Sequence, residues 1–418
     1  MCNSRVVPLS LSLVALGLLV AAQALAGPGD FDKTFGKRGK VILEGEAVDV
    51  ATQSDRKVLV LRQDERKGDA AVIVSRLRRN GKVDMRFGRN GRTAIPLAGD
   101  EHAAGLALQA NGRIVVGFTS DPSGSDRLFG VARLRPNGAL DDSLDGDGIQ
   151  TSGFGSGFDA LTARDVGVGA DGQIVLVGNA YPTAGDFHPY FAVAQYDTNG
   201  QLDGSFSGDG VQTTDITGVS NVATAVAVDS QGRVVAAGTA RQGGSQIALA
   251  RYDESGELDS SFAGDGTVLS GFATLAEDVI ALPDDRIVVA SGVSSDFLVA
   301  RFGEDGTPDS GFAGDGAKVI DFSDGADTAF ALARDGQKLV AAGSSRTHLR
   351  GTDYAVARIR PNGKLDRRFS DDGLRQVDFG GEDRAHGVAV DRTGKVVLGG
   401  EVNRRARRDV AGIVRLRG

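Results

Sequence analysis

The sequence has almost no cysteine: Cys2 is the only one among 418 residues. It lies in a segment with the features of a secretory signal peptide, namely Arg5 near the start, an apolar stretch over 9–22 and an A-x-A cleavage site at 24–26. Cleavage at that site would remove Cys2. The exported chain would then contain neither a disulfide nor a thiol nucleophile.

Long apolar stretches are absent after this segment, and nothing later reaches the roughly 20 residues that a membrane-spanning helix needs. We therefore predict a signal peptide over residues 1–26, one folded domain over residues 27–418, and a periplasmic or extracellular location. A basic excess is absent too, because 47 Lys and Arg stand against 55 Asp and Glu. Removal of Arg5 with the signal peptide lowers the formal net charge of -8 by one more charge, which argues against bulk nucleic-acid binding.

The sequence has no Trp and only 10 Pro, and it lacks the apolar period of amphipathic helices. It is rich in glycine instead, with 60 Gly, about twice the usual fraction of roughly 7%. Short alternating or β-branched apolar stretches lie between the glycines. This pattern is typical of many short strands joined by tight turns.

One unit recurs seven times along the chain. Each copy carries an Asp-x-x-Phe element closed by glycine, as in LDGSFSGDG at 202–210, and its aromatic position recurs every 50 to 62 residues. This period suits a four-stranded propeller blade better than a helical repeat. A sharp turn or a positive φ explains why the closing glycine recurs. The Asp and aromatic positions are Asp32/Phe35, Asp84/Phe87, Asp141/Leu144, Asp203/Phe206, Asp259/Phe262, Asp309/Phe312 and Asp366/Phe369.

Each unit contains four predicted strands, which in the fourth unit fall at 224–228, 233–238, 247–252 and 267–269. Dipeptides such as Asn199-Gly200 predict tight hairpins between strands. The first strand has a small residue at its midpoint in six of the seven units, which places it innermost, where blades converge. The midpoint residues are Ala51, Ala107, Gly167, Ala227, Ile280, Ala331 and Ala389.

The predicted fold is all-β: a single seven-bladed β-propeller with four antiparallel strands per blade. The chain ends with a predicted third strand at 410–416 and begins, after the signal peptide, with a turn that leads into a fourth. We therefore expect residues 40–43 to complete the last blade as its outer strand. Closure of this kind removes free sheet edges.

The repeated run LDxSFxGDGxV, followed by AVAV, DGxIVVAG and VARY-NG, resembles the delta-60 repeat family of predicted β-propellers over residues 30–418. The resemblance implies the propeller fold. It implies almost nothing about activity, because the family is defined by its repeat. Departures from the pattern are Leu144 in place of Phe, Gln195 in place of the third-strand Arg, and the looser SDRKVLVL of the first unit.

Two motifs look chemical but have structural explanations. The D-x-S-x-D-G run at 141–146 resembles the start of an EF-hand loop, yet position 12 is Ser152, where a bidentate Glu is required. We interpret it as a turn whose aspartate caps backbone N–H groups. The repeated Asp and the third-strand Arg, such as Asp259 and Arg251, are expected to form an ion pair in each blade rather than an anion-binding ring.

The sequence contains no G-x-S-x-G elbow, no P-loop and no H-E-x-x-H, and its four His have no metal-ligand spacing. Asp49, Asp165 and Asp278 directly precede the inner strand in units one, three and five. With Glu277 and His386 nearby in the repeat frame, these aspartates are candidates for a calcium site at the channel mouth, as in some seven-bladed lyases and lactonases that this architecture resembles. Hydrated turn aspartates are the simpler explanation. The other units have Gly105, Ala225, Ala329 and Gly387 at this position.

Connections that vary in length, from strand two to three and from blade to blade, are expected on one face of the ring. Variable loops on a fixed scaffold are typical of binding surfaces. Basic residues gather in these loops in units six, seven and one, and predict a basic sector that docks an anionic protein, glycan or lipid surface; solvated charge is the alternative. The candidate residues are Arg66, Lys67, Arg346, His348, Arg350, Arg404, Arg405, Arg407 and Arg408.

The sequence thus predicts an exported, noncatalytic binding or scaffolding propeller without a cofactor, and we expect a monomer. The alternative is a propeller enzyme of the lyase or lactonase type with a divalent cation, calcium, at the channel mouth. Converging carboxylates within about 5 Å at that mouth would favour the enzyme.

Overall fold

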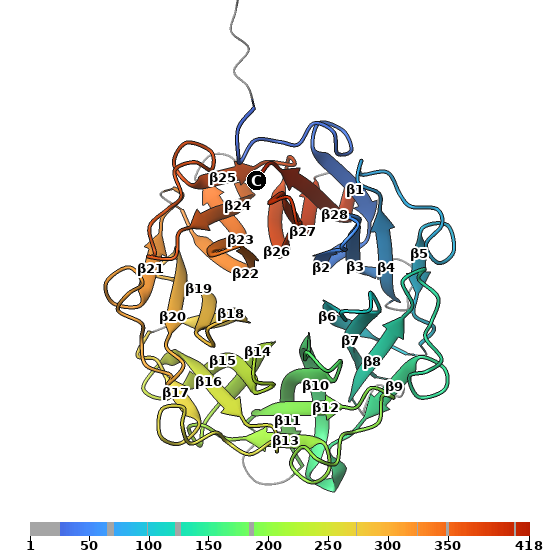
Figure 1. Cartoon of the computed structure of the whole chain (residues 1–418), viewed down its shortest axis with the longest axis vertical. Helices are drawn as coiled ribbons and strands as arrows, with labels where there is room; N and C mark the ends of the chain where they lie inside the picture. The colour runs from blue at the N-terminus through green and yellow to red at the C-terminus, as the bar shows by residue number, and fades with distance from the viewer. Residues whose placement is uncertain are drawn as a thin grey trace, which may run out of the picture.

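The computed structural model describes residues 26–418 except 65–70, 98, 122–126, 184–187, 273, 324, 348–350 and 405–406. All but the last residue of the predicted signal peptide lies outside the described residues. The described chain forms seven four-stranded antiparallel sheets arranged as a ring (Figure 1). Within it, helix is confined to one 3₁₀ turn, Gly155–Gly157, and no apolar helix reaches membrane-spanning length. The predicted seven-bladed propeller is confirmed.

Blades 1 to 6 each use four consecutive strands, ordered from the channel to the rim, and blade 7 uses three strands from the end of the chain and one from its beginning. In blade order, the strands are β2 Glu46–Thr52, β3 Val58–Asp64, β4 Ala71–Leu77, β5 Arg92–Ala94; β6 His102–Leu108, β7 Ile114–Ser120, β8 Leu128–Leu134, β9 Ile149–Ser152; β10 Phe158–Val168, β11 Ile174–Pro182, β12 Tyr190–Tyr196, β13 Val211–Thr214; β14 Asn221–Val228, β15 Val234–Arg241, β16 Ser245–Tyr252, β17 Thr267–Leu269; β18 Leu275–Ala281, β19 Ile287–Val293, β20 Asp296–Phe302, β21 Ala317–Ile320; β22 Asp327–Asp335, β23 Lys338–Thr347, β24 Gly351–Ile359, β25 Leu374–Val377; and β26 Glu382–Val390, β27 Val396–Arg404, β28 Arg407–Leu416, β1 Lys40–Glu44.

The two ends of the chain close the ring, as predicted. Strand β1 pairs antiparallel with β28 from Lys40 opposite Val414 to Glu44 opposite Val410, and Figure 1 shows the two strands side by side. Just before β1, the carboxylate of Asp32 lies 2.8 Å from the Arg415 guanidinium. Blade 7 is therefore held by both a strand ladder and an ion pair between distant parts of the sequence.

The aromatic residue of each repeat fills the space between neighbouring blades. Phe262 is fully buried and packs with Leu249 of blade 4 and with Ile287 and Phe302 of blade 5. Its equivalents are equally buried, so the repeated phenylalanine belongs to the core as the repeat pattern indicates. The seven residues are Phe35, Phe87, Leu144, Phe206, Phe262, Phe312 and Phe369.

The repeated ion pair is also confirmed. Arg251 Nε lies 2.8 Å from Asp259 Oδ2, and the guanidinium lies 4.5 Å from the Phe262 ring centroid. Another nitrogen of Arg251 donates to the backbone carbonyl of Glu304 in the next blade. Burial alone would raise the pKa of Asp259, but hydrogen bonds from Ser261 and the charge of Arg251 lower it. The buried guanidinium thus makes contacts within its blade and to the next one, as the ion-pair interpretation predicts.

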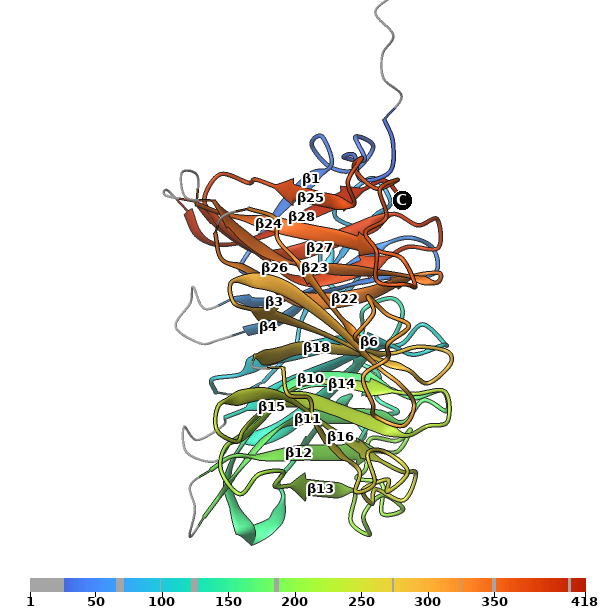
Figure 2. The same cartoon turned by 90° about the vertical axis from the view of Figure 1, so that its left-hand side faces the viewer.

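Strand direction divides the molecule into two faces, which Figure 2 shows edge-on. The hairpins joining strands one to two and three to four lie on one face, called here the turn face, together with the Asp-x-x-Phe elements. The connections from strand two to three and from blade to blade lie on the other, called the loop face. The alternation follows from the antiparallel order within each sheet.

Candidate functional site at the channel mouth

Every inner strand carries a β-bulge at the same place, in the half of the strand nearest the loop face. In blade 5, the register between β18 and β19 shifts between Ala276 and Asp278, so Glu277 is the extra residue. A bulge changes the direction of the side chain it carries. The seven extra residues all line one hollow of about 730 Å³ at the channel mouth. They are Val48, Ala104, Arg164, Thr224, Glu277, Phe330 and His386.

The position of the bulge shows that the predicted alignment of the inner strand of blade 6 was wrong by two residues. The register shift lies between Ala329 and Ala331, so the equivalent of Asp278 is Ala331 and not Ala329. The strand midpoint is accordingly Ala333 rather than Ala331. The run AFALAR allows either alignment, because a shift of two residues keeps every side chain on the same face of a strand.

The three candidate aspartates follow the bulge directly, and all line the hollow. Each carboxylate joins two blades. Asp165 Oδ1 accepts a 2.7 Å hydrogen bond from Val166 N in its own strand, and Oδ2 accepts one of 2.9 Å from Val226 N in blade 4. Asp49 and Asp278 repeat this arrangement with the blades that follow them, accepting from Leu106 N at 3.1 Å and from Leu332 N at 2.6 Å. The aspartates therefore fasten neighbouring inner strands to each other.

The alternation of aspartate with a small residue has a steric cause. A Cβ on Gly105 in blade 2 would lie 2.6 Å from Asp165 Oδ1, and one on Gly387 in blade 7 would lie 2.8 Å from Asp49 Oδ1. An aspartate in one blade thus requires little or no side chain at the same position in the blade before it. Because seven is odd, the alternation must fail once, and it does so at Ala331 and Gly387 in blades 6 and 7.

These carboxyl groups are held in an environment that disfavours charge. Burial raises the pKa of Asp49 to about 7 and that of Asp278 to about 6, although backbone hydrogen bonds oppose the change. Burial and then the charge of Asp278 raise the pKa of Asp165 well above its usual range. Among the described residues, the groups of three metal-ligating side chains with atoms within 4.8 Å of one another lie elsewhere. Calcium at Asp49, Asp165 and Asp278 stays a prediction.

Glu277 and His386 are two of the bulge residues that line the mouth, and they interact electrostatically. Burial raises the pKa of Glu277 to about 7, against the opposing charges of His386 and Arg164. The His386 ring centroid lies 5.5 Å from that of Phe330, and its Nε2 lies 4.0 Å from the Glu401 carboxylate. A carboxyl group that titrates near neutral pH can accept or donate a proton or bind a cationic group.

The predicted basic sector is only partly described. Arg346 is exposed near the end of β23, on the loop face, as expected from its loop. Arg404, Arg407 and Arg408 lie in β27 and β28, and the structure describes their strand positions alone. The remaining candidates lie outside the described residues: Arg66, Lys67, His348, Arg350 and Arg405. Docking of an anionic partner by this sector stays a prediction.

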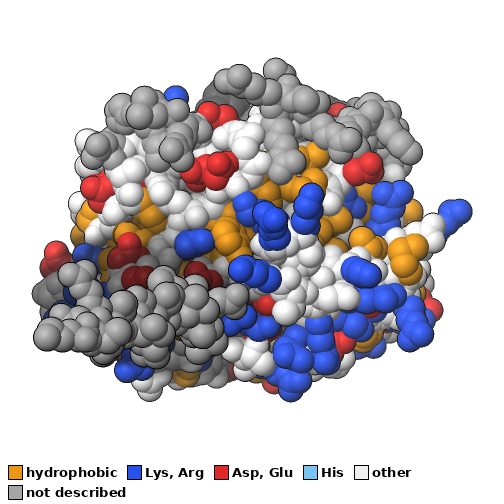
Figure 3. Space-filling view, turned by 90° about the horizontal axis from the view of Figure 1, so that it is seen from above, with side chains coloured by type: hydrophobic (Ala, Val, Ile, Leu, Met, Phe, Trp, Pro, Cys, Tyr) orange, Lys and Arg blue, Asp and Glu red, His pale blue; other side chains and the backbone are white. Residues whose placement is uncertain are grey.

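Exposed basic side chains also occur where the sequence analysis did not place them. Figure 3 looks down on the edge of the ring near β1, β25 and β28, and Lys and Arg side chains gather on part of it. Lys33, Lys37 and Arg38 are exposed in the segment that precedes the closing strand β1, and Arg78 and Arg79 are exposed in the turn after β4 of blade 1. Positive charge is thus not confined to the predicted loops.

Sequence reasoning missed Arg164 and Phe330 as mouth residues. Their signal is present in the repeat frame: the residue just before the Asp, Gly or Ala that follows the bulge differs in every unit, while its neighbours vary little. A bulge is not visible in a hydrophobic pattern, because the pattern gives only which face a residue takes in a regular strand.

Comparisons with known proteins agree with the fold. Solved structures of similar fold include a catalytically inactive variant of virginiamycin B lyase from Staphylococcus aureus with quinupristin, at 10% identity over 90% of this chain and 98% of that chain, with a TM-score of 0.50. Puromycin hydrolase matches at 13% identity over 90% of this chain and 53% of that chain, with a TM-score of 0.51. At such identity the likeness shows the fold alone.

No curated protein is significantly similar in sequence. Five segments of the chain match the family described as "Domain of unknown function (DUF5122) beta-propeller", and these segments are residues 109–144, 169–206, 230–262, 282–312 and 337–369. In each of blades 2 to 6, the segment runs from just after the inner strand to the repeated aromatic position. The repeats in these five segments belong to this family of β-propellers.

Proposed function

We propose that the protein is an exported, noncatalytic binding propeller that takes a small polar ligand at the channel mouth. One observation carries the proposal: each blade contributes its bulge residue to a single hollow, and these seven residues differ in chemistry. A volume of about 730 Å³ suits a small molecule, since such sites have roughly 300–1,000 Å³.

The lining suggests the chemistry of the ligand. Glu277 offers a carboxylate, Thr224 a hydroxyl group, and Phe330 and His386 offer ring surfaces. Amines and amino sugars combine a cationic group with a less polar face and fit this set, because aromatic rings also attract cations. Since the pKa of Glu277 is raised to about 7, an amine should bind more tightly at pH 8 than at pH 6, where Glu277 is protonated.

A thermal-shift screen tests this function with a panel of small amines, amino sugars and neutral sugars. The wild-type protein is compared with Glu277→Gln, Phe330→Ala and the control Glu254→Gln, which alters an exposed glutamate on the turn face. We expect at least one compound to stabilise the wild type and the control but not the two mouth variants. Equal stabilisation of all four proteins would contradict a site at the mouth.

A second function, an enzyme with acid–base chemistry at the mouth, is favoured by the raised pKa of Glu277 and by its charge interaction with His386. The lyase among the proteins of similar fold makes this alternative worth testing, although the likeness concerns fold alone. Mass spectrometry of each stabilising compound after incubation separates the two functions. If the wild type converts a compound and His386→Asn still binds that compound but no longer converts it, the protein is an enzyme and not only a binding protein.

Docking of an anionic partner on the loop face extends the binding proposal. It is supported by the adjacency of blades 6, 7 and 1 and by the exposed Arg346. Retention on an anionic polysaccharide matrix is compared for the wild type and a variant with Ala at Arg404, Arg405, Arg407 and Arg408. Weaker retention of the variant at low salt, with both proteins eluting as screening shortens to about 8 Å near physiological ionic strength, supports docking. Equal retention of the two proteins at low salt would show that the arginines of blade 7 take no part in docking.

A further inference from the structure

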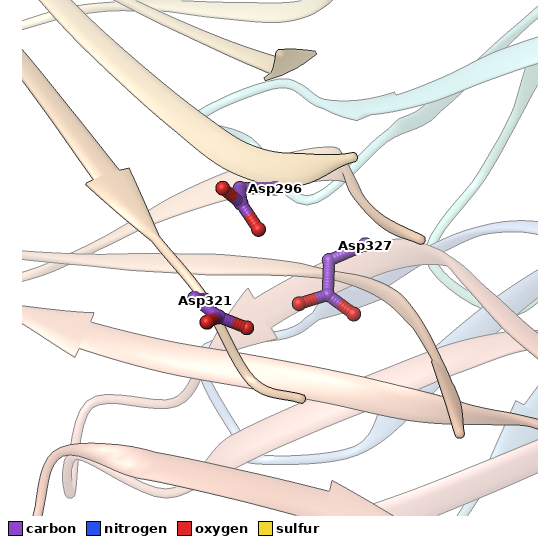
Figure 4. Close-up of side chains that lie close together, drawn as sticks. All are labelled: Asp296, Asp321 and Asp327. Atoms are coloured by element: carbon purple, nitrogen blue, oxygen red, sulfur yellow. The ribbon is translucent and has the colours of Figure 1, made fainter. Parts of the chain in front are cut away.

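Three aspartates meet at the boundary of blades 5 and 6, away from the channel residues discussed above. Asp296 begins β20, Asp321 follows β21, and Asp327 begins β22. Each offers one carboxylate oxygen such that all three oxygens lie within 4.8 Å of one another. Figure 4 shows the three side chains directed toward one another from these separate segments.

This spacing matches a single bound cation. Oxygen ligands of calcium lie roughly 2.3–2.6 Å from the ion, so two of them on opposite sides are separated by about 4.8 Å. Oxygens that all lie within that distance can share one ion with little movement. Calcium suits the arrangement better than magnesium, since calcium accepts irregular sets of carboxylates whereas magnesium demands near-octahedral geometry.

The buried member of the group is incompletely satisfied. Asp327 is only 1% exposed, and its Oδ2 accepts a 2.8 Å hydrogen bond from Phe322 N. Its Oδ1 is buried without a hydrogen-bond partner among the described residues. A buried carboxylate oxygen without a partner is costly, and native proteins usually pair such atoms with protein, water or an ion.

The group also lacks a neutralising side chain in the described part of the chain. There, no Lys, Arg or His forms an ion pair within 4.0 Å with Asp296, Asp321 or Asp327. Burial, and then the charge of Asp321, raises the pKa of Asp296. Burial also raises the pKa of Asp327, hydrogen bonds from Phe322 N and the Ser345 hydroxyl oppose this, and the charges of Asp321 and Asp296 add smaller increases. Three carboxylates that repel one another favour a cation between them.

We propose that Asp296, Asp321 and Asp327 bind one calcium ion, which clamps blade 5 to blade 6. The proposal goes beyond the ligand site at the channel mouth and does not depend on it. Asp296 lies in blade 5, Asp321 directly follows the last strand of blade 5, and Asp327 begins the first strand of blade 6. The ion would therefore hold the end of blade 5 against the start of blade 6.

The same positions in blades 3 and 4 are closed without an ion. The equivalent of Asp327 is Asn221, whose amide donates a 2.7 Å hydrogen bond to Asp215 Oδ1. Asp215, the equivalent of Asp321, also accepts from Gly218 N at 2.7 Å. At the boundary of blades 3 and 4, an amide donor therefore does what we assign to calcium at the boundary of blades 5 and 6.

The boundary of blades 6 and 7 offers a second group, made of Asp353, Asp378 and Asp383. A cationic side chain is already present beside it. Lys40 Nζ lies 4.5 Å from the ring centroid of Phe379 and donates to the backbone carbonyl of Asp378. The ammonium group offsets negative charge at this boundary, so we assign the ion to the first group.

Calorimetric titration of the chelator-treated, signal-free chain with calcium chloride tests the assignment. We expect one ion per chain and a melting temperature that rises with calcium concentration. Asp296→Asn and Asp327→Asn should each weaken calcium binding by about tenfold or more, because each removes a charged ligand. The matched controls Asp378→Asn, at the second group, and Asp278→Asn, at the channel mouth, should bind like the wild type.

Several results would overturn the proposal. Absence of both binding heat and a thermal shift in the wild type excludes the site. If Asp378→Asn or Asp278→Asn loses calcium binding while Asp296→Asn retains it, the ion binds at another group of carboxylates and the assignment is wrong. Equal affinity for magnesium chloride rejects calcium as the specific ion. Should Asp327→Asn not fold, Asp296→Asn, at a half-buried position, decides the matter alone.

Discussion

The turn face and the loop face of this ring are built in opposite ways. On the turn face, the blades repeat one set of contacts, in which a buried arginine pairs with an aspartate, lies over a phenylalanine and reaches the next blade. On the loop face, the bulge in each inner strand carries a different residue into the shared hollow. The turn-face positions that make the same interblade contact in successive blades stay alike, whereas the bulge positions on the channel are free to differ. In this repeat protein, uniformity indicates the scaffold and departure from it indicates the site.

The largest expected effect comes from deleting residues 27–43, which removes the closure of the turn-face network. The deletion takes away all but the last residue of β1 and the fully buried Phe35, and leaves Arg415 without Asp32. Loss of one partner of a buried pair alone costs about 3–5 kcal/mol. Thermal unfolding should show a much lower midpoint than deletion of 242–244, the turn between β15 and β16. Equal midpoints would show that the ring is held without its closing strand.

A smaller but still large effect is expected from Phe262→Ala. The side chain is fully buried between blades 4 and 5, so truncation should lower the free energy of unfolding by about 3–5 kcal/mol. Urea denaturation measures this, with Val319→Ala as the exposed control. A loss below about 1 kcal/mol, the level of ordinary surface changes, would contradict the interblade role of the repeated phenylalanine.

The inner strands should give the molecule a pH dependence. In the unfolded chain Asp49 titrates near 3.8, and burial raises its pKa to about 7 in the fold. Its contribution to stability is therefore fully present below about pH 4 and is lost as the pH rises through 7. Between pH 5 and pH 8 the free energy of unfolding should fall, and it should fall less in Asp49→Asn by an amount on the order of 1 kcal/mol. Asp171→Asn, at an exposed turn, is the control. Identical slopes in all three proteins would leave Asp49 without this role.

The repeat made most of the fold predictable. The seven copies of the Asp-x-x-Phe element gave the number of blades. Because the chain ends after a third strand and begins with the turn before a fourth, the two ends were predicted to share blade 7, and the β1–β28 ladder confirms this. The ion pair of Arg251 and Asp259 was predictable for the same reason. The ion pair recurs wherever the third strand carries Arg, and in blade 3 the amide of Gln195 donates to Asp203 instead.

The site was less predictable, because it depends on how the blades lie against each other. The sequence drew attention to Asp49, Asp165 and Asp278, but not to their bonds with the next blade, since a strand pattern does not contain the interblade register. Arg164 and Phe330 gave no signal of hydrophobic period, and the run around Ala331 allowed two alignments. Asp296, Asp321 and Asp327 come from three separate segments, and only the fold brings them together.

The central claim is that the bulge residues serve a ligand and not the fold, and the stability of Glu277→Gln at pH 8 tests it most directly. Because burial raises the pKa of Glu277 to about 7, the wild type holds an ionised, half-buried carboxylate at pH 8, which disfavours the folded state. Glutamine removes that charge at nearly the same volume. In urea denaturation at pH 8 we predict that Glu277→Gln is as stable as the wild type or more stable. A loss of more than about 1 kcal/mol, beyond that of ordinary surface changes, would make Glu277 a structural residue and contradict the account.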